Sequence, residues 1–519
     1  MKTKSKEKKA IVILDFGSQY THLIKAQLYS LSINSVIEAA DCTVSLFQRL
    51  HSNIGVAGII LSGGPQSIYT SKIKFDRRWL QQGIPILGIC FGHQLLAHLF
   101  GGVVQRGQAE YGREFITIKS TSKLLKGLPK RLTVWMSHRD TVTKLPRNFV
   151  SRATSSYGGN TIIEQPNLKF YGLQFHPEVS HTQGGLKILS NFVTNICLMP
   201  RFRKWTPQAF IAEAASIYRD KVWRGKVLCA VSGGVDSMTL LALLRKTLSK
   251  PQLLAVYIDS GLMPVATKAE VRAFCHQYDI TLLVHDASNI FFRRLKGITD
   301  PSLKCKVIGK IFIEEFEKIA TQRKIHFLAQ GTIWSDVVES GITKFSSQIK
   351  PHHNVAGLPS KLHVTLIEPP RELFKDQVRI VAKKLKLPNP IVNKKVFPGP
   401  GFAIRVEGEV TRKKVTLVRQ TTEIIESIIF ESKIARHIWM AFAILINVPS
   451  LGVKGDGRIE NKHAMVVRIV ESKNSMTANF SRRALPYLEA ISDRIIKETP
   501  IGRVVYDITN KPPATIEWQ

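Results

Sequence analysis

Short apolar runs that end in glycine-rich turns recur along this chain, and stretches with helical spacing follow them. Residues 11–14 precede a turn at 15–18, residues 56–61 precede a turn at 62–65, and residues 85–89 precede a third turn. Strands that alternate with helices, with glycine-rich turns at the strand ends, are typical of a doubly wound parallel sheet. Such a sheet gathers its functional groups at the carboxyl edge of the strands.

A second pattern of the same kind begins at residues 226–231, turns at Ser232-Gly233-Gly234 and continues into a helical stretch at 238–244. A linker is expected at 201–206, and a boundary at the proline- and glycine-rich stretch 388–401. The other expected elements are strands at 133–136, 170–175, 253–258, 281–284 and 327–329 and helices around 186–193 and 306–320.

The chain of 519 residues is long enough for about three domains. We expect a basic tail at 1–10, an α/β domain at 11–200, a second α/β domain at 201–394 and a small α+β domain at 395–519. The expected fold class is therefore α/β, with two doubly wound, mainly parallel sheets followed by the smaller domain.

Lysine and arginine outnumber aspartate and glutamate by 74 to 39, which gives a formal net charge of +35. The excess is spread almost evenly along the chain, which favours a generally basic surface over a nucleic-acid-binding arm. The six cysteines form no Cys-x-x-Cys pair, and no apolar run reaches the roughly 18 residues of a membrane span. We expect a soluble cytoplasmic protein that binds neither nucleic acid nor membrane.

A cysteine lies in the turn Gly88-Ile89-Cys90-Phe91-Gly92, between an expected strand and an expected helix. Glycines on both sides permit the tight turn of a nucleophile elbow, which raises the middle side chain above the sheet edge. The positive end of the helix dipole also favours the thiolate form of Cys90. Taken alone, the motif is more typical of a structural turn with a buried thiol.

Two other turns supply the groups that a nucleophilic cysteine needs. His176-Pro177-Glu178 offers a general base and a carboxylate that can orient it. Gly63-Gly64 offers backbone N–H groups to a developing oxyanion. Each turn alone could be an ordinary histidine or an ordinary loop, but the three together favour acyl transfer through Cys90.

Residues 11–195 resemble the class I glutamine amidotransferase domain, in the turns at 15–20, 62–65 and 88–92 and in Phe175-His176-Pro177-Glu178-Val179. The resemblance implies that Cys90 attacks the side-chain amide of glutamine and releases ammonia. It also implies that His176 moves the proton and that Glu178 orients His176. Gly64 and the amide of Phe91 would hold the oxyanion.

The turn Ser232-Gly233-Gly234-Val235-Asp236-Ser237 joins another expected strand to a helix. Its glycines let successive N–H groups face a phosphate, the serines can donate hydrogen bonds, and Asp236 can bind Mg²⁺. The lysine of a Walker A motif is absent, and the turn resembles instead the loop of ATP pyrophosphatases. We expect MgATP as co-substrate, no organic cofactor, and a mobile lid at 344–359, although a solvated loop would fit that segment too.

Residues 11–519 resemble the glutamine-hydrolysing GMP synthetases through further motifs, among them Phe397-Pro398-Gly399-Pro400-Gly401 and Gly455-Asp456-Gly457-Arg458. The resemblance implies a homodimer that adenylates xanthosine monophosphate (XMP) and lets ammonia displace AMP to give GMP. The positions implied for the acceptor nucleotide are Arg503, Lys511, Ile516, Glu517 and Lys375. Arg503 and Lys511 would lie near its phosphate.

Several positions depart from the pattern of this family around the acceptor site. Cys305 and Pro264 stand in place of arginines, Met440 replaces a glutamine, and Lys394-Lys395 replaces Arg-His. Because a methionine cannot read a purine edge by hydrogen bonds, the acceptor pocket is altered or rebuilt. Two alternatives stay open: an amidotransferase of the same fold that acts on another purine-like nucleotide, and a non-catalytic paralogue that binds nucleic acid.

Overall fold

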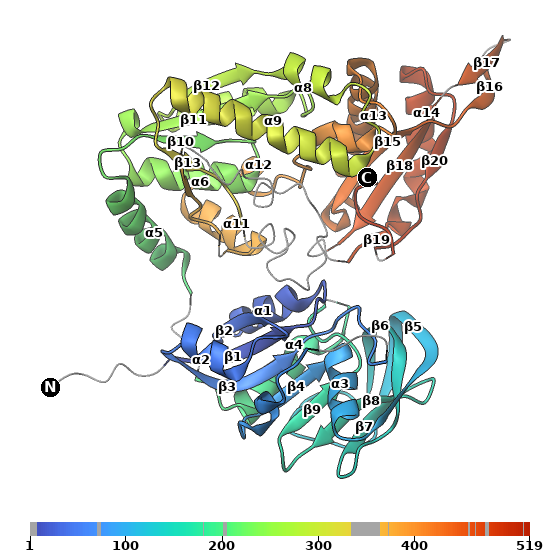
Figure 1. Ribbon diagram of the computed structural model, residues 1–519. Coiled ribbons are helices and arrows are strands. Elements are labelled where there is room, and N and C mark those ends of the chain that lie inside the picture. Colours follow the sequence, from blue (N-terminus) through green and yellow to red (C-terminus); the bar gives the residue numbers. More distant parts are fainter. Residues whose placement is uncertain are drawn as a thin grey trace. The chain divides into compact units, whose positions relative to one another are not determined.

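A computed structural model describes most of the chain, and the described residues divide into two compact units (Figure 1). One unit ends at Trp205 and the other begins at Thr206. The described residues are 8–69, 74–179, 181–200, 205–333, 364–371, 373–454, 457–461, 463–472, 477–511 and 513–518. The predicted lid at 344–359 and most of the predicted linker at 201–206 lie outside them.

The first unit is built on a nine-stranded sheet in the order β2-β1-β3-β4-β9-β8-β7-β5-β6. Its strands are β1 (Lys8–Asp15), β2 (Ser35–Ala39), β3 (Ile54–Leu61), β4 (Ile86–Ile89), β5 (Val103–Ile118), β6 (Arg131–Lys144), β7 (Val150–Ser155), β8 (Asn160–Gln165) and β9 (Phe170–Leu173). The helices are α1 (Thr21–Ser30), α2 (Val44–Leu50), α3 (Phe91–Leu99) and α4 (Gly185–Asn191). The half from β2 to β9 is parallel, as predicted, whereas β8, β7, β5 and β6 pair antiparallel.

Alternate residues of the parallel strands enter two separate cores, one on each face of the sheet. Ile11 and Ile13 of β1 pack with α1 and α4, whereas Val12 and Leu14 pack with α2 and α3. All four of these side chains are completely buried. Strands that are covered on both faces are continuously apolar, which is why the sequence pattern identified them.

The second unit contains a five-stranded, fully parallel sheet in the order β12-β11-β10-β13-β14. Its strands are β10 (Val227–Ala230), β11 (Leu253–Asp259), β12 (Thr281–Asp286), β13 (Phe327–Ala329) and β14 (Thr365–Ile367). Helices α6 (Val235–Thr247) and α7 (Ala266–Gln277) pack on one face, and α8 (Ser288–Leu295) and α9 (Pro301–Gln322) on the other. Helices α5 (Pro207–Val222), α11 (Lys375–Lys384) and α12 (Asn389–Val392) complete this part.

Helix starts in the second unit follow from local capping. Thr206, Asp300 and Thr411 accept hydrogen bonds from backbone N–H groups in the first turns of α5, α9 and α13 (Arg412–Phe430). Pro207 and Pro301 follow two of these caps and begin their helices without a donor to satisfy.

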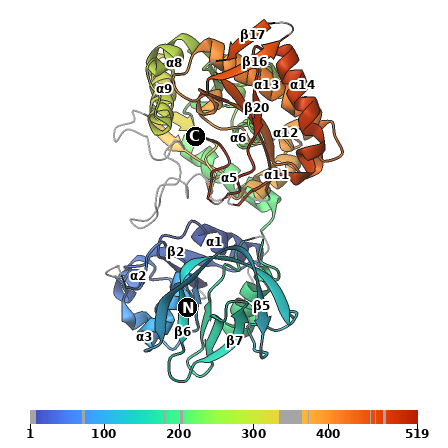
Figure 2. The same cartoon turned by 90° about the vertical axis from the view of Figure 1, so that its right-hand side faces the viewer.

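The rest of the second unit is α+β, as predicted. Strand β18 (Ala464–Glu471) pairs with β15 (Met440–Ile446), β19 (Asn479–Phe480) and β20 (Val504–Tyr506), and β16 (Ser450–Lys454) pairs with β17 (Gly457–Asn461). Helix α14 (Leu488–Glu498) packs on α13 and β20 (Figure 2). One continuous core joins α8 and α9 to α13, β15 and β18, so the predicted boundary at residue 394 stays a prediction.

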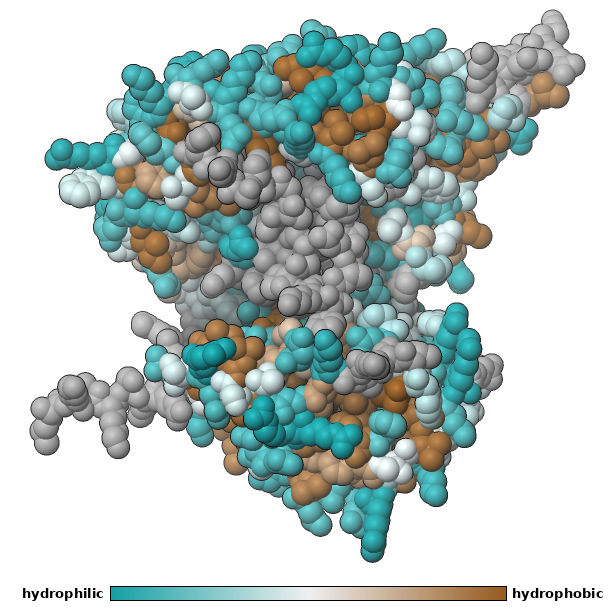
Figure 3. All heavy atoms as spheres, viewed as in Figure 1, coloured by the Kyte–Doolittle hydropathy of each residue, from teal (hydrophilic) through white to brown (hydrophobic). Residues whose placement is uncertain are grey.

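Hydrophobic side chains on the face shown in Figure 3 form small groups among hydrophilic ones. In the described part of the chain, no helix is both long and apolar enough to cross a membrane.

Candidate active site

Cys90 occupies a strained turn between β4 and α3. Its φ of +52° lies in the left-handed region, which a non-glycine residue rarely adopts. The flanking glycines make the turn possible, because a Cβ on Gly88 would lie 2.4 Å from the Gly92 carbonyl oxygen. A Cβ on Gly92 would lie 2.4 Å from the carbonyl oxygen of Leu61 on β3. The predicted nucleophile elbow is therefore present in the backbone.

His176 and Glu178 follow β9 and lie beside this turn. The Nδ1 atom of His176 is 2.7 Å from Oε1 of Glu178, and both side chains are buried. A Cβ added to Gly63 would lie 3.0 Å from Cε1 of His176 and 3.5 Å from Cβ of Cys90. The structure thus brings the predicted nucleophile, base and orienting carboxylate together next to a glycine turn.

The surroundings of His176 favour its protonated form. Burial lowers the pKa of its imidazole, but interactions with Glu178 and Cys90 outweigh burial and raise this pKa to about 10. The ring of Tyr20 packs edge-on against the imidazole, with 4.8 Å between centroids. At neutral pH this environment stabilises an imidazolium beside the sulfur, the arrangement of an activated cysteine.

The two predicted oxyanion donors belong to different segments. The amide of Phe91 is the first of α3 and has no partner within the helix. Gly64 follows β3, where a Cβ would lie 2.5 Å from the carbonyl oxygen of Phe16. Phe16 in turn donates its N–H to Ser62 Oγ at 2.9 Å, which fixes the turn after β3 against the end of β1.

Strand β6 and the end of β9 add residues that the sequence did not reveal as part of this site. The Cys90 Sγ atom lies 3.7 Å from the Ser137 carbonyl oxygen. Gln94, on α3, donates to the Asp140 carbonyl oxygen at 2.7 Å, and Gln174 Nε2 lies 4.0 Å from Sγ. A glutamine on the buried face of α3 was the available signal, because buried amides need partners.

The Ser232–Ser237 turn lies where the strand order of the second unit reverses, between β10 and β13. Ser237 Oγ accepts a hydrogen bond from Ser232 N at 3.1 Å and donates to the Gly234 carbonyl oxygen at 3.1 Å. Gly233 has a φ of +77°, and Val235 begins α6. These bonds hold a glycine-rich loop at a helix N-terminus, which is an arrangement that binds phosphate.

Asp236 and Lys375 form an ion pair in this loop, with 2.5 Å between Nζ and Oδ2. The structure therefore places Lys375, which was predicted for the acceptor nucleotide, at the start of α11 against the ATP loop. The other carboxylate oxygen of Asp236 is buried and has no hydrogen-bond partner among the described residues. That free oxygen fits one ligand of a Mg²⁺ ion whose other ligands come from phosphates and water. No cluster of three metal-binding side chains occurs in the described ranges.

The chain end that carries the other predicted acceptor residues is tied down by buried arginines. Arg405 donates to both carboxylate oxygens of Glu517, at 2.9 and 3.0 Å, and stacks on the ring of Phe442. Arg468 donates to the Ile516 carbonyl oxygen at 2.7 Å. Of the remaining predicted residues, Lys511 forms a backbone bridge with Ala478, and Arg503 is exposed just before β20.

The departing positions have unlike surroundings. Cys305 and Met440 are buried, and Met440 packs in the same apolar cluster as Ile516. Lys394 pairs with Glu270, and Lys395 donates to the Ile438 carbonyl oxygen at 2.6 Å. Pro264 lines a cavity beside β11.

Models of three protein families match consecutive parts of this chain. "Glutamine amidotransferase class-I" matches residues 12–196, "PP-loop domain" matches 208–303 and "GMP synthase C terminal domain" matches 427–518. A crystal structure of a putative GMP synthase component from Thermoplasma acidophilum is 31% identical, with a TM-score of 0.33. It covers 37% of this chain and 96% of that chain.

Full-length relatives extend these matches over the whole molecule. The "GMP synthase [glutamine-hydrolyzing]" of Campylobacter lari is 43% identical over 518 residues, which cover 99% of this chain and 100% of the relative. The protein of the same name from Staphylococcus aureus strain MSSA476 is 41% identical and covers 99% of each chain. This chain therefore belongs to the family of glutamine-hydrolyzing GMP synthases.

Proposed function

We propose that this chain makes GMP from XMP, ATP and glutamine, with Cys90 releasing the ammonia that is consumed at the Ser232–Ser237 loop. The observation that carries the proposal is the buried Cys90–His176–Glu178 arrangement on a glycine-flanked turn, in a chain that also carries the phosphate-binding loop. Glutamine-dependent GMP synthesis requires both kinds of site. The assignment of roles to single residues is our own.

In the first half-reaction, the sulfur of Cys90 attacks the side-chain amide carbon of glutamine. The amides of Gly64 and Phe91 donate to the oxyanion, and protonated His176 gives its proton to the departing nitrogen, which leaves as ammonia. Water then attacks the glutamyl thioester with His176 as base, which releases glutamate and restores the thiolate–imidazolium pair. Glu178 keeps the imidazole oriented throughout, through its contact with Nδ1.

In the second half-reaction, the purine C2 oxygen of XMP attacks the α-phosphate of ATP and pyrophosphate leaves. Backbone N–H groups and the hydroxyls of Ser232 and Ser237 hold the departing pyrophosphate. Mg²⁺, bound through Asp236, would neutralise charge on the phosphates. Ammonia then attacks C2 and AMP departs, which completes GMP. Lys375 holds Asp236 in place through the ion pair.

We assign the acceptor nucleotide to the C-terminal segment, with Arg503 and Lys511 near its phosphate and Glu517 near its ribose. The grip of Arg405 on both oxygens of Glu517 supports a fixed carboxylate at this place. The apolar cluster of Met440 and Ile516 favours contact with a purine face rather than readout of its edge. A different purine-like acceptor is therefore the alternative to XMP.

The surroundings of the enzyme also belong to the proposal. We propose three domains with boundaries at residues 200 and 394, a homodimer formed through the C-terminal domain, and a cytoplasmic location. We further propose that the chain acts on small molecules, without a nucleic-acid or membrane partner.

The formation of AMP and pyrophosphate from MgATP, with XMP and ammonium, tests the second half-reaction directly. Cys90→Ala should abolish synthesis with glutamine and keep synthesis with ammonium. Loss of both activities in a folded Cys90→Ala protein would contradict the division of labour. Pyrophosphate release with another purine nucleotide, and none with XMP, would identify a different acceptor.

A further inference from the structure

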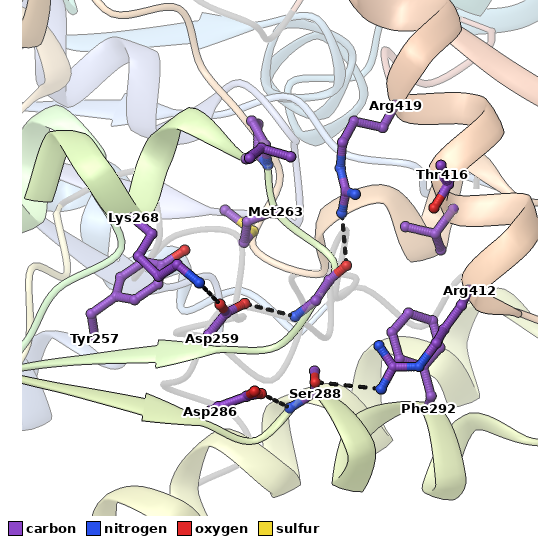
Figure 4. Close-up of a pocket in the computed structure, with 14 residues that line it drawn as sticks. Tyr257, Asp259, Met263, Lys268, Asp286, Ser288, Phe292, Arg412, Thr416 and Arg419 are labelled. Atoms are coloured by element: carbon purple, nitrogen blue, oxygen red, sulfur yellow. Dashed lines mark hydrogen bonds and ion pairs between the residues drawn. The ribbon is translucent and has the colours of Figure 1, made fainter.

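A cavity of about 330 Å³ lies in the second unit, at the carboxyl ends of β11 and β12 and against one face of α13 (Figure 4). Its volume is within the range of sites that hold small molecules. Among the described residues, none of the Ser232–Ser237 loop lines it. The strand order reverses elsewhere, between β10 and β13, so this cavity is separate from the predicted ATP loop.

Two arginines of α13 face the cavity without a carboxylate in salt-bridge contact. Arg412 donates to Asn289 Oδ1 at 2.6 Å and stacks on the ring of Phe292, and Arg419 donates to the Gly261 carbonyl oxygen at 2.8 Å. Neither forms an ion pair within the described part of the chain. Burial lowers the pKa of Arg419, and the attraction of more distant carboxylates does not offset this effect. An anion in the cavity would supply a direct counter-charge.

The carboxylates that line the cavity do not neutralise these arginines. Asp259 is paired with Lys268, with 2.8 Å between Oδ2 and Nζ. Asp286 accepts the N–H of Ser288 at 2.9 Å, and its pKa is lowered chiefly by that bond. The lining therefore keeps an excess of positive charge on the side of α13.

The cavity also offers a hydroxyl and apolar surface. Thr416 lies one helical turn from Arg412 on the same face of α13, and Figure 4 shows its hydroxyl between the two arginines. Met263 and the ring of Phe292 line the same space. Guanidinium forks and a hydroxyl suit phosphate oxygens, whereas a thioether and an aromatic ring suit a planar base.

From this geometry we infer that the cavity binds a nucleoside monophosphate, at a site separate from the ATP loop. Arg412, Arg419 and Thr416 hold the phosphate, and the apolar lining holds the base. The inference does not depend on the residue roles proposed for GMP synthesis.

Labelled GMP and AMP, offered separately to the full-length chain, test this site by equilibrium dialysis. A non-hydrolysable ATP analogue and XMP are kept at saturating concentrations, so that the proposed catalytic sites are filled. We expect saturable binding of one nucleotide per chain, weakened about tenfold or more by Arg412→Gln, because a charge-assisted hydrogen bond is lost. Thr416→Glu should abolish binding, since it places a negative charge beside the phosphate.

Lys413→Gln is the matched control, because Lys413 is exposed on the same helix and does not line the cavity. It should leave binding unchanged. Asp236→Asn should also leave it unchanged, which separates failure of this inference from failure of the ATP loop assignment. Binding that survives both Arg412→Gln and Thr416→Glu would overturn the inference, as would absence of saturable binding. Competition by inorganic phosphate at equal concentration would overturn the assignment of a nucleotide.

Discussion

Replacement of Glu178 by glutamine removes one charge from the most constrained part of the glutaminase site. In Glu178→Gln the new amide is isosteric with the carboxylate, so its oxygen can still accept the hydrogen from His176 Nδ1. What is lost is the negative charge at 2.7 Å from that nitrogen. Because burial lowers the pKa of His176, the imidazole should then lose its proton at a lower pH.

The structure sets the size of this effect. Interactions with Glu178 and Cys90 raise the pKa of His176 from 6.5 to about 10 against the opposing effect of burial. At about 1.4 kcal/mol per pKa unit, the imidazolium is stabilised by about 5 kcal/mol. If Glu178 supplies most of that, Glu178→Gln should slow glutamine hydrolysis by about 10³.

Glutamate release at several pH values, compared with GMP formation from ammonium, measures this loss. The raised pKa keeps the imidazolium below about pH 10, so the alkaline limb of the wild-type profile should lie near that value and shift to lower pH in Glu178→Gln. Glu38→Gln is a matched control, since Glu38 and His51 form a partly exposed pair at the same 2.7 Å distance. Less than a tenfold loss in Glu178→Gln, or an equal loss in Glu38→Gln, would refute the reasoning.

Three further changes test other parts of the structure. Gly88→Ala should destabilise the first unit by about 3 kcal/mol, because its Cβ would meet the backbone at 2.4 Å, whereas Gly309→Ala, in an open position of α9, should stabilise the second unit by up to about 1 kcal/mol; thermal melting compares them. Lys375→Met should reduce pyrophosphate release about 10²-fold and leave glutamine hydrolysis intact, and equal loss of both would contradict its place at the ATP loop. Burial raises the pKa of Glu426 to about 7, so stability falls as pH rises from about 4.5 through 7; Glu426→Gln should remove that fall in urea unfolding at pH 5 and 8, and an unchanged pH dependence would argue against it.

Local sequence patterns predicted the parts of the fold that depend on neighbouring residues. The apolar runs of β1, β3, β4, β10 and β11 were identified because both faces of these strands are covered. The two glycine-rich turns were identified because each combines a strand, a tight turn and a helix within a few residues. The antiparallel half of the first sheet was not foreseen, since its strands are half-exposed and their pairing is set by contacts distant in sequence.

The same division applies to the residues around the sites. His176 and Glu178 could be predicted, because they are two positions apart after a recognisable strand. Ser137 and Gln174 could not, since their approach to Cys90 depends on how β6 and β9 lie beside α3. Lys375 was assigned to a different ligand, because a lysine at the start of a helix does not reveal which carboxylate it will meet across 139 positions of sequence.

Backbone proximity explains why glycine carries so much of the predictable information in this chain. At Gly88 and Gly92, any side chain would collide with a carbonyl oxygen, so β3, β4 and α3 can approach closely only with glycine there. That close approach places the amide of Phe91 and the sulfur of Cys90 on one side of the turn, beside His176. A similar constraint acts on Gly331, where a Cβ would lie 2.9 Å from the N atom of Ser237 in the phosphate loop. Both candidate sites are thus built where the backbone leaves no room for a side chain, and a sequence shows such places directly as glycine.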